Sequence, residues 1–385
     1  MARTAKVANM AVSTTTLNYG MVGCGMMGQE HLRNLALIEG ATVSAIFEPD
    51  ADMRQRSSAL APQARFVDSL GALLAHAPLH ALVITSPNHC HAAQLMEIAT
   101  TRALPVLMEK PACTNLADVA RLQQLAKTYP APLWTAMEYR YMPPIAAFIE
   151  QVKSAASTGG TAMLSIREHR YPFLAKVGDW NRFERNTGGT LVEKCCHFFD
   201  LMRLIIGRDP VRVFASGGQN HNHVDETYPE GRPDILDNAY VIVDFGQGQR
   251  ALLDLCMFAE GSRYQEHISV VGPNGKVECF IPGPTRFWPE ASLGPAPVAQ
   301  LIVSPRTPQG PRMLEIPVDP ALLAAGDHNG STFYQHQRFF KAVAAGGPVE
   351  VSLTDGLKAV VIGLAAEHSA KSGEAVDLTR GAYAL

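Results

Sequence analysis

The segment LNYGMVGCGMMG, residues 17–28, decides how the chain folds. A short apolar run leads into the glycine pattern GxGxxG at Gly23, Gly25 and Gly28. In a dinucleotide-binding turn these glycines permit, in order, a tight turn, close approach of the backbone to a pyrophosphate, and packing of helix against strand. The helix that begins there points its N-terminus at the phosphates. The segment therefore predicts a strand–turn–helix unit that binds a dinucleotide.

An acid follows at the distance that such a turn requires. Glu48, in AIFEPD, lies 20 positions after Gly28 (48 − 28 = 20). A carboxylate at this strand end accepts the hydroxyls of the adenosine ribose and repels a 2′-phosphate. Arg54 and Arg56 follow and could neutralise such a phosphate. The balance favours NAD over NADP.

The first third of the chain alternates β-rich runs with helix-like segments. Alternation of this kind predicts a parallel sheet with crossover helices, an α/β Rossmann domain. We place this domain at residues 17–140, after a flexible tail at 1–16. The expected strands are 17–22, 42–47, 81–86, 105–110 and 132–137.

From about residue 141 the pattern changes to consecutive strands, which favours an open, mainly antiparallel sheet. We expect a second, α+β domain over 141–385 that binds substrate and mediates oligomerisation. One continuous helix is expected at about 190–206, and residues 282–330, rich in Pro and Gly, predict a long surface excursion. The expected strands are 161–170, 211–218, 238–246, 249–258, 267–272 and 276–281, and helices are expected near 144–154, 331–345 and 354–371.

Composition excludes several classes of protein. Hydrophobic residues make up 47% of the 385 residues and charged residues 18%, which is typical of a globular protein. A net charge of -3 argues against nucleic acid or an anionic membrane as partner, because both require a basic face. Neither an apolar run long enough to span a membrane nor a secretory signal is present, so we expect a cytoplasmic protein. Seven scattered cysteines without a CxxC motif predict reduced thiols.

Four motifs occur in order: GCGMMG at 23–28, SPNHCH at 86–91, MEKPAC at 108–113 and GGTLVEKCCHFFD at 188–200. Together with the antiparallel second half, the chain resembles the Gfo/Idh/MocA oxidoreductases, the family of glucose–fructose oxidoreductase and inositol dehydrogenase. The resemblance extends from residue 17 to about 371. It implies a tightly held nicotinamide cofactor between a Rossmann domain and an open-sheet domain, with sugars, inositols or related polyols as substrates.

The resemblance also implies roles for particular residues. Lys110 matches the lysine of the EKP motif, which contacts the reacting hydroxyl and the nicotinamide ribose. Asn88 and His91 match a turn that lines the cofactor, and Trp180 and Arg182 resemble an element that reaches the cofactor from the second domain. Further cofactor contacts are expected from the same motifs at Met26, Met27, Ser86 and Glu109.

Glu193 and His197 fall where many members of that family carry an Asp and a His four positions apart, and the Glu is a departure. On one continuous helix the two side chains project together, and an acid beside an imidazole fixes its tautomer. Oxidation of an alcohol requires a base for the hydroxyl proton, which favours His197. It also requires a cation near the developing alkoxide, which favours Lys110. Lys110 could instead relay the proton if burial lowers its pKa.

Cys195 and Cys196 lie between that acid and that histidine, and invite other interpretations. Zinc requires three or four ligands, and neither HNH at 221–223 nor NHCH at 88–91 adds the Cys or acid spacing that marks a site. A vicinal disulfide is rarer still, and a cysteine nucleophile requires a base that points toward it. We therefore expect no metal site and a packing role for both thiols.

The segment 167–186 is dense in polar and aromatic side chains that suit a polyhydroxylated ligand. We expect His169 and Lys176 from this segment, with Lys194 and Arg140, to line the substrate pocket. Such a pocket would be cationic, so an acidic substrate is one hypothesis. A solvated basic loop is the alternative.

Three functions follow from these residues. The leading one is an NAD-dependent dehydrogenase acting on a ring hydroxyl of a sugar, glycoside or inositol. The alternative is an NAD-dependent glycosidase that hydrolyses a glycoside by transient oxidation, elimination, water addition and re-reduction. A non-catalytic NAD-binding protein is the third. By analogy with the family, the open sheet is expected to form a homo-dimer or homo-tetramer.

Overall fold

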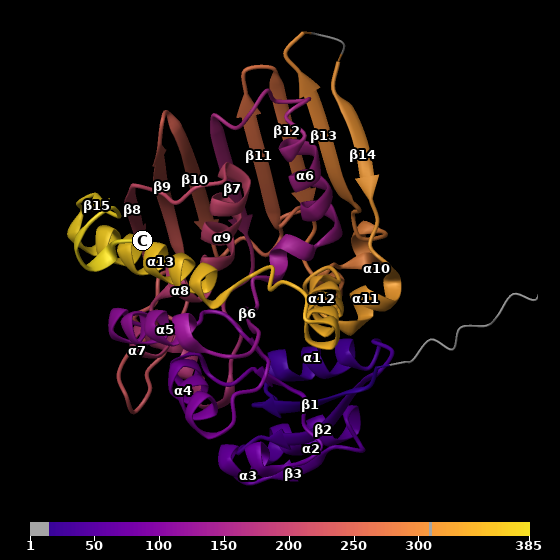
Figure 1. The fold of residues 1–385 in the computed structure, drawn as a ribbon. Helices are drawn as coiled ribbons and strands as arrows, with labels where there is room; N and C mark the ends of the chain where they lie inside the picture. The colour runs from indigo at the N-terminus through magenta and orange to yellow at the C-terminus, as the bar shows by residue number, and fades with distance from the viewer. Residues whose placement is uncertain (1–14, 308–309) are drawn as a thin grey trace, which may run out of the picture.

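The computed structural model describes residues 15–307 and 310–385. The predicted tail at 1–16 therefore lies almost wholly outside the described residues. Two sheets organise the chain, one in each half of the sequence (Figure 1). The last strand of the first sheet ends at Thr135 and the first strand of the second begins at Met163. The expected domain boundary at 140–141 falls in this interval and remains a prediction.

The first sheet has six parallel strands in the order β3-β2-β1-β4-β5-β6, as a Rossmann domain requires. The order reverses between β1 and β4, and ligands bind at such a point, outside the carboxyl ends of the strands. The strands are β1 Leu17–Val22, β2 Ala41–Phe47, β3 Arg65–Val67, β4 Ala81–Ile84, β5 Val106–Met108 and β6 Leu133–Thr135. The helices are α1 Met26–Leu35, α2 Ala51–Leu60, α3 Leu70–Ala75, α4 His91–Thr101 and α5 Leu116–Thr128, with a 3-10 turn η1 at Asn88–Cys90.

Two of these elements are absent from the sequence expectations. The α2 helix buries one residue, Ser57, so it lacks the apolar stripe by which a helix is recognised. Its N-cap, Asp50, accepts a hydrogen bond from the backbone of Met53. The β3 strand is three residues long, too short to show a period.

The second sheet has nine strands in the order β14-β13-β12-β11-β7-β10-β9-β8-β15. All pairs are antiparallel except β7 with β10, so the expectation of a mainly antiparallel sheet is confirmed. The strands are β7 Met163–His169, β8 Arg212–Gly218, β9 Asn238–Gly246, β10 Gln249–Cys256, β11 Glu266–Gly272, β12 Gly275–Ile281, β13 Ala299–Pro305, β14 Arg312–Ile316 and β15 Val376–Asp377.

The expected surface excursion at 282–330 is wrong in part, because β13 and β14 add two strands to the edge of this sheet. Side chains of β13 alternate between buried and half-buried, but neighbouring Pro and Gly residues hide that short pattern in the sequence. The rest of the segment holds the 3-10 turn η4 at Thr285–Phe287 and the short helices α10 Glu290–Leu293 and α11 Pro320–Ala325.

Helices cover one face of the second sheet. Figure 1 shows α6, α9 and α13 on that face, where they contact β12, β10 and β8 respectively. The α12 helix reaches back to the first half of the chain and packs on α1. These helices span Pro143–Lys153 (α6), Cys196–Ile206 (α9), Ser331–Ala345 (α12) and Leu353–Ser372 (α13). The smaller elements are η2 Glu138–Tyr141, η3 Val177–Arg182, α7 Glu184–Thr187, α8 Thr190–Glu193 and η5 Gly381–Tyr383.

The continuous helix expected over 190–206 is wrong. The chain forms α8, makes a turn at Lys194 and Cys195, and restarts as α9. The amide of Cys195 donates to the carbonyl of Thr190, five positions back, instead of four. One extra residue in a turn rotates everything beyond it, so Glu193 and His197 do not share the stripe that an unbroken helix would give.

No helix in the described part of the chain combines the length and apolar character needed to cross a membrane.

Candidate active site

The glycines of the first turn occupy three different environments. Gly23 has a φ of +84°, and a Cβ there would lie 2.8 Å from the backbone of Ser86. A Cβ on Gly28 would lie 2.8 Å from Thr85 Oγ1, so this position permits close packing. A Cβ on Gly25 would meet no protein atom within 4 Å. Gly25 thus borders open space, where a ligand can approach the backbone.

That open space is a cavity of about 580 Å³ at the carboxyl ends of the first sheet. Its volume lies within the range of about 300–1,000 Å³ that is usual for ligand and cofactor pockets. Its walls include the expected cofactor residues Gly23, Gly25, Met26, Met27, Glu48, Ser86, Asn88, Glu109, Lys110 and Trp180, together with Lys176.

Glu48 is held at the rim of this cavity. Its carboxylate accepts hydrogen bonds from the amides of Cys24 at 2.5 Å and Asp50 at 2.8 Å. Arg56 also lines the cavity, whereas Arg54 pairs with Asp68. The acid expected at the ribose is therefore oriented by the glycine turn itself.

Three of the expected cofactor residues do not line the cavity. Gly28 packs behind it, as described above. His91 lies with its ring nitrogens 2.8 Å from the carbonyl oxygen of Pro111 and 2.9 Å from that of Ser86, so it joins the two loops. Arg182 is buried and pairs with Glu226 at 2.9 Å. None of the three lies at the surface of the cavity.

A second cavity of about 100 Å³, called the chamber below, adjoins the first. The two share Met26, Met27, Lys110 and Lys176 as lining residues. Other chamber residues come from both halves of the chain: Glu30, Tyr139, Arg170, Glu193, Lys194, His197, Glu266 and His328. A ligand in the chamber would therefore lie beside a ligand in the cofactor cavity.

Lys110 extends from the end of β5 to the chamber. Its ammonium donates to the backbone carbonyl of Glu193 at 3.1 Å. Burial alone would lower the pKa of Lys110, but Cys196 and the carboxylates of Glu109, Glu138 and Glu193 raise it above the usual value. The raised pKa favours the role of a cation over that of a proton relay for Lys110.

His197 is fully buried in the chamber wall. Its ring stacks on Tyr139, with ring centroids 4.1 Å apart. Nε2 lies 3.5 Å from a carboxylate oxygen of Glu138, and Nδ1 has no hydrogen-bond partner in the described residues. Burial, followed by the charges of Lys110 and Lys194, holds the pKa of His197 well below its usual value. The imidazole is therefore neutral and can accept a proton.

The expected pairing of Glu193 with His197 is not observed. One Glu193 oxygen lies 3.4 Å from the ammonium of Lys176, which also lies over the ring of Trp180. The acid beside His197 is Glu138. A turn between α8 and α9 separates the two residues, although both side chains line the chamber.

Of the other residues expected to contact substrate, only some line the chamber. Lys194 lines the chamber but donates to the Tyr139 hydroxyl at 2.5 Å and pairs with Glu168 at 2.9 Å. His169 lies in a separate cavity of about 90 Å³ and contacts Asp254. Arg140 lines none of these cavities, because its guanidinium is committed to the buried carboxylate of Asp200.

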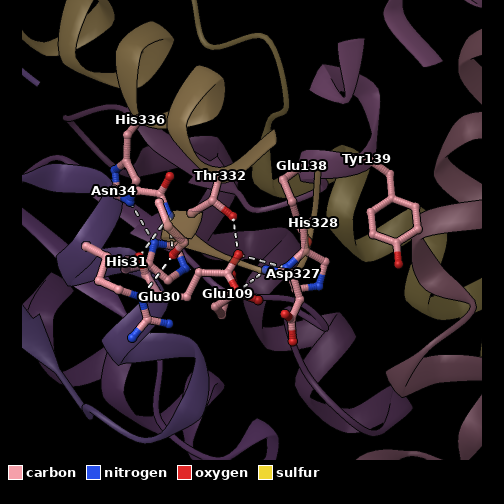
Figure 2. Close-up of polar contacts among 12 residues, drawn as sticks. Glu30, His31, Asn34, Glu109, Glu138, Tyr139, Asp327, His328, Thr332 and His336 are labelled. Carbon is pink, nitrogen blue, oxygen red and sulfur yellow. Dashed lines mark hydrogen bonds and ion pairs between the residues drawn. The ribbon is translucent and has the colours of Figure 1, made fainter. Parts of the chain in front are cut away.

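Sequence reasoning missed a group of buried acids and histidines beside the chamber (Figure 2). His31 lies 2.8 Å from Glu109 and His328 lies 2.8 Å from Glu30. Burial would lower the pKa of His328, but the charge of Glu30 raises it to about 9. Glu138 belongs to the same region. It follows β6, so the rule that strand ends face the crevice could have found it, whereas His328 lies in a loop without a motif.

The vicinal cysteines take part in packing. Cys195 and Cys196 are buried, and all seven cysteines are free. Burial raises the pKa of the Cys196 thiol to about 12, so it is not a thiolate nucleophile at neutral pH. Within residues 15–307 and 310–385, no group of three or more His, Cys, Asp or Glu side chains is arranged to hold a metal ion.

Three features define the class of this protein: a Rossmann sheet with its glycine turn, a cofactor cavity and an adjoining polar chamber. Together they are the features of an NAD-binding oxidoreductase. Two family models match this chain. One, described as the NAD-binding Rossmann fold of an oxidoreductase family, matches residues 17–137, and the other, its C-terminal alpha/beta domain, matches residues 159–378. The chain belongs to the Gfo/Idh/MocA oxidoreductase family.

Individual relatives align with nearly the whole length of this chain. Myo-inositol 2-dehydrogenase of Thermotoga maritima is 25% identical over 365 residues, which cover 94% of this chain and 98% of that protein. A structure of levoglucosan dehydrogenase with NADH and levoglucosan matches with a TM-score of 0.78 at 18% identity, covering 95% and 100% of the two chains. An oxidoreductase from Agrobacterium radiobacter in complex with NAD+, L-tartaric acid and magnesium matches with a TM-score of 0.76 at 18% identity, covering 94% and 99%. These two structures share the fold.

The environment of Gly25 predicts how a substitution there affects NAD binding. Gly25→Ala places a methyl group where the pyrophosphate approaches, so we expect at least about a tenfold weaker Kd for NAD, about 1.4 kcal/mol. The melting temperature should stay near that of the wild type, because the methyl meets no protein atom. Titration calorimetry and thermal unfolding measure the two effects.

Gly71→Ala is the matched control. A Cβ there would also be almost free of contacts, but Gly71 lies in α3 and does not line the cofactor cavity. Unchanged NAD affinity in Gly25→Ala would contradict the assignment of this cavity to NAD.

Proposed function

We propose that this protein is an NAD-dependent dehydrogenase that oxidises a ring hydroxyl of an uncharged inositol or sugar. The observation that carries the proposal is the chamber beside the cofactor cavity, with Lys110 and His197 both in its wall. The pKa of Lys110 is raised and the pKa of His197 is lowered, which favours an ammonium beside a neutral imidazole. The names of the relatives, an inositol and a levoglucosan dehydrogenase, support the substrate class.

The two residues supply what alcohol oxidation requires. Bound NAD supplies the hydride acceptor. Lys110 orients the reacting hydroxyl and stabilises the negative charge that develops on its oxygen. His197 accepts the hydroxyl proton, since its imidazole is neutral at physiological pH.

An uncharged substrate follows from how the cations of the chamber are paired. Lys194 and Arg170 both contact Glu168, at 2.9 and 3.4 Å, and Lys176 contacts Glu193 at 3.4 Å. An anionic substrate would have to displace these carboxylates. This pairing supports a neutral polyol over the acidic substrate of the earlier hypothesis.

Lys110 differs from these paired cations. None of the described carboxylate oxygens forms an ion pair with its ammonium within 4.0 Å, and its one hydrogen-bond acceptor there is the carbonyl of Glu193. A substrate hydroxyl can therefore approach Lys110 without breaking an ion pair.

A substrate panel tests this assignment. We expect NAD reduction with at least one of a set of inositols and pyranoses, and a kcat/KM for the matching uronic acid at least about tenfold lower, since the acid carboxylate meets paired cations. Absorbance of NADH measures both. Preference for the uronic acid would contradict the neutral-substrate assignment.

The glycosidase alternative is tested in the same assay with aryl glycosides. A dehydrogenase forms one NADH for each ketone and leaves the glycosidic bond intact. Release of the aglycone without net NADH would contradict the proposal and identify the protein as a glycosidase.

We further propose that the outer face of the second sheet joins two copies of the chain. Phe214, Ile242 and Leu252 are register partners across β8, β9 and β10, and all three are exposed. Tyr240, on the same strand as Ile242, is 62% exposed. A row of exposed apolar side chains on a sheet is typical of an interface.

The oligomeric state tests this interface. We expect the wild type to elute as a dimer or tetramer, and the double variant Tyr240→Glu, Ile242→Lys to elute as a monomer, because two charges would be buried at the interface. Leu293→Glu, at an equally exposed position in α10, is the control and should not change the oligomer. Light scattering gives the masses, and a monomeric wild type would contradict the proposal.

A further inference from the structure

We propose that a third cavity of this protein, called the outer cavity below, is a subsite for a second, uncharged sugar ring, so that the substrate is a disaccharide or a larger glycoside. The outer cavity is the one that His169 lines. Its volume is about 90 Å³, close to the about 100 Å³ of the chamber. The inference rests on the proposed function and adds a second ring to the substrate named there.

The outer cavity adjoins the chamber. Arg170, Tyr171, Gln265 and Pro284 line both cavities. These residues lie at the end of β7, directly before β11 and shortly after β12. A ligand with one ring in the chamber can therefore extend a second ring into the outer cavity past the same four residues. Because the two volumes are similar, a chamber that admits one ring is matched by an outer cavity that admits another.

Aromatic and apolar side chains form one wall of the outer cavity. Tyr171, Phe287, Trp288 and Leu293 line it, and the rings of Tyr171 and Phe287 lie 4.4 Å apart between centroids. Phe287 and Leu293 are both exposed. Large apolar side chains left exposed around a hollow are typical of a ligand site. Such side chains can cover the C–H faces of a sugar ring.

Polar groups supply hydrogen bonds for the hydroxyls of that ring. Gln265 is 8% exposed and donates through Nε2 to Glu266 at 2.6 Å. Its side-chain oxygen lies beside Gly283, where a Cβ would be 3.1 Å away, and both residues line the outer cavity. Ser262 adds a hydroxyl group to the same wall. Mainly apolar walls with a few placed polar groups are the usual form of a small-molecule site.

The charges at the outer cavity favour an uncharged ring. The guanidinium of Arg170 pairs with Glu168 at 3.4 Å, and His169 lies 3.1 Å from Asp254. Glu260 also lines the cavity and is exposed. A second ring that carried a carboxylate or a phosphate would meet this acid and cationic groups that already have partners.

The segment that builds the outer cavity is stiff. Four prolines in its wall each have a fixed φ: Pro282, Pro284, Pro289 and Pro297. The indole of Trp288 donates to the carbonyl of Gly294 at 2.8 Å. A site that is already in shape before the ligand arrives loses less conformational entropy on binding.

An ion pair joins this segment to the chamber. Arg286, which precedes Phe287, donates to the carboxylate of Asp327 at 2.9 and 2.6 Å. Asp327 lines the chamber, and its amide donates to Glu30, another chamber residue, at 3.2 Å. The helices α11 and α12, which flank Asp327, both contact α1 (Figure 1). Part of the Pro- and Gly-rich segment 282–330 is thus held beside the chamber, and the inference gives it a function.

A second copy of the chain is the competing occupant, since exposed apolar side chains also occur at interfaces. The sheet face proposed for self-association is formed by β8, β9 and β10. The lining residues of the outer cavity lie outside those strands and form a hollow next to the chamber. A second ring of the substrate is therefore the occupant that the geometry favours.

Kinetics with one-ring and two-ring sugars test the subsite. The probes are glucose, its disaccharides maltose, cellobiose and isomaltose, and myo-inositol, each with NAD. We expect at least one disaccharide to have a kcat/KM about tenfold above that of glucose. The gain should come mainly from a lower KM, because the outer cavity contacts a part of the substrate that does not react.

Two outcomes of these kinetics separate the inference from the proposed function. If glucose or myo-inositol forms NADH and no disaccharide has a higher kcat/KM, the inference is overturned and the proposed dehydrogenase stands. If no inositol, pyranose or disaccharide forms NADH, both are overturned.

Phe287→Ala tests the same subsite at one side chain. The ring that it removes is 43% exposed, so we expect the variant to fold. The ratio of kcat/KM for the preferred disaccharide to kcat/KM for glucose should fall about tenfold. An unchanged ratio would overturn the inference. A change of mass in light scattering with the ratio retained would also overturn it, in favour of a second copy of the chain.

Phe258→Ala is the matched control. Phe258 is 37% exposed, and its ring centroid lies 4.4 Å from that of His221, the same spacing as between Phe287 and Tyr171. It lines none of the three cavities. Its variant should keep the wild-type ratio, and an equal fall in both variants would contradict a specific role of Phe287.

Saturation-transfer NMR tests binding without turnover. With NADH in place of NAD, a bound disaccharide cannot be oxidised. In the wild type we expect protons of both rings of the preferred disaccharide to receive saturation, and in Phe287→Ala one ring should lose it. Saturation confined to one ring in the wild type would overturn the inference, even if Phe287→Ala does not fold.

Discussion

The ammonium of Lys110 is the constraint on which the rest of the site depends. It extends from β5 of the first sheet to the backbone of Glu193 at the end of α8, so it joins the two halves of the chain at the chamber. Carboxylates around it raise its pKa, and its charge adds to burial in holding the pKa of His197 low. Lys110 thus helps set the protonation state of His197, the group proposed to accept the hydroxyl proton.

The remaining charges near the chamber are arranged so that they do not compete with Lys110. Lys176, Lys194 and His328 each lie beside a carboxylate, at 3.4, 2.9 and 2.8 Å. The electric field of each of these ion pairs largely cancels at a distance. The ammonium of Lys110 has no such partner and is available to contact a ligand at short range. This arrangement is consistent with the proposed recognition of an uncharged polyol by hydrogen bonds, with Lys110 available for the oxygen that reacts.

Much of the fold and the cofactor turn could be predicted from the sequence, because both depend on short-range patterns. Gly23 and Gly28 are where steric limits place glycine, and Lys110 lies at a strand end. The helix break at Cys195 could not be predicted, because tertiary contacts of Lys194 with Tyr139 and Glu168 accompany it. Without that break Glu193 appears to be the partner of His197, and Glu138 is overlooked.

The neutral state of His197 beside a charged Lys110 is the central claim, and nitrogen-15 NMR of the histidine rings tests it most directly. The chain has 13 histidines, so His197→Gln is needed to assign the signal. The account predicts that the ring is still neutral at about pH 6.5, the usual His pKa, and that Lys110→Met raises its pKa. A His197 that titrates near 6.5 in the wild type, unaffected by Lys110→Met, would contradict it.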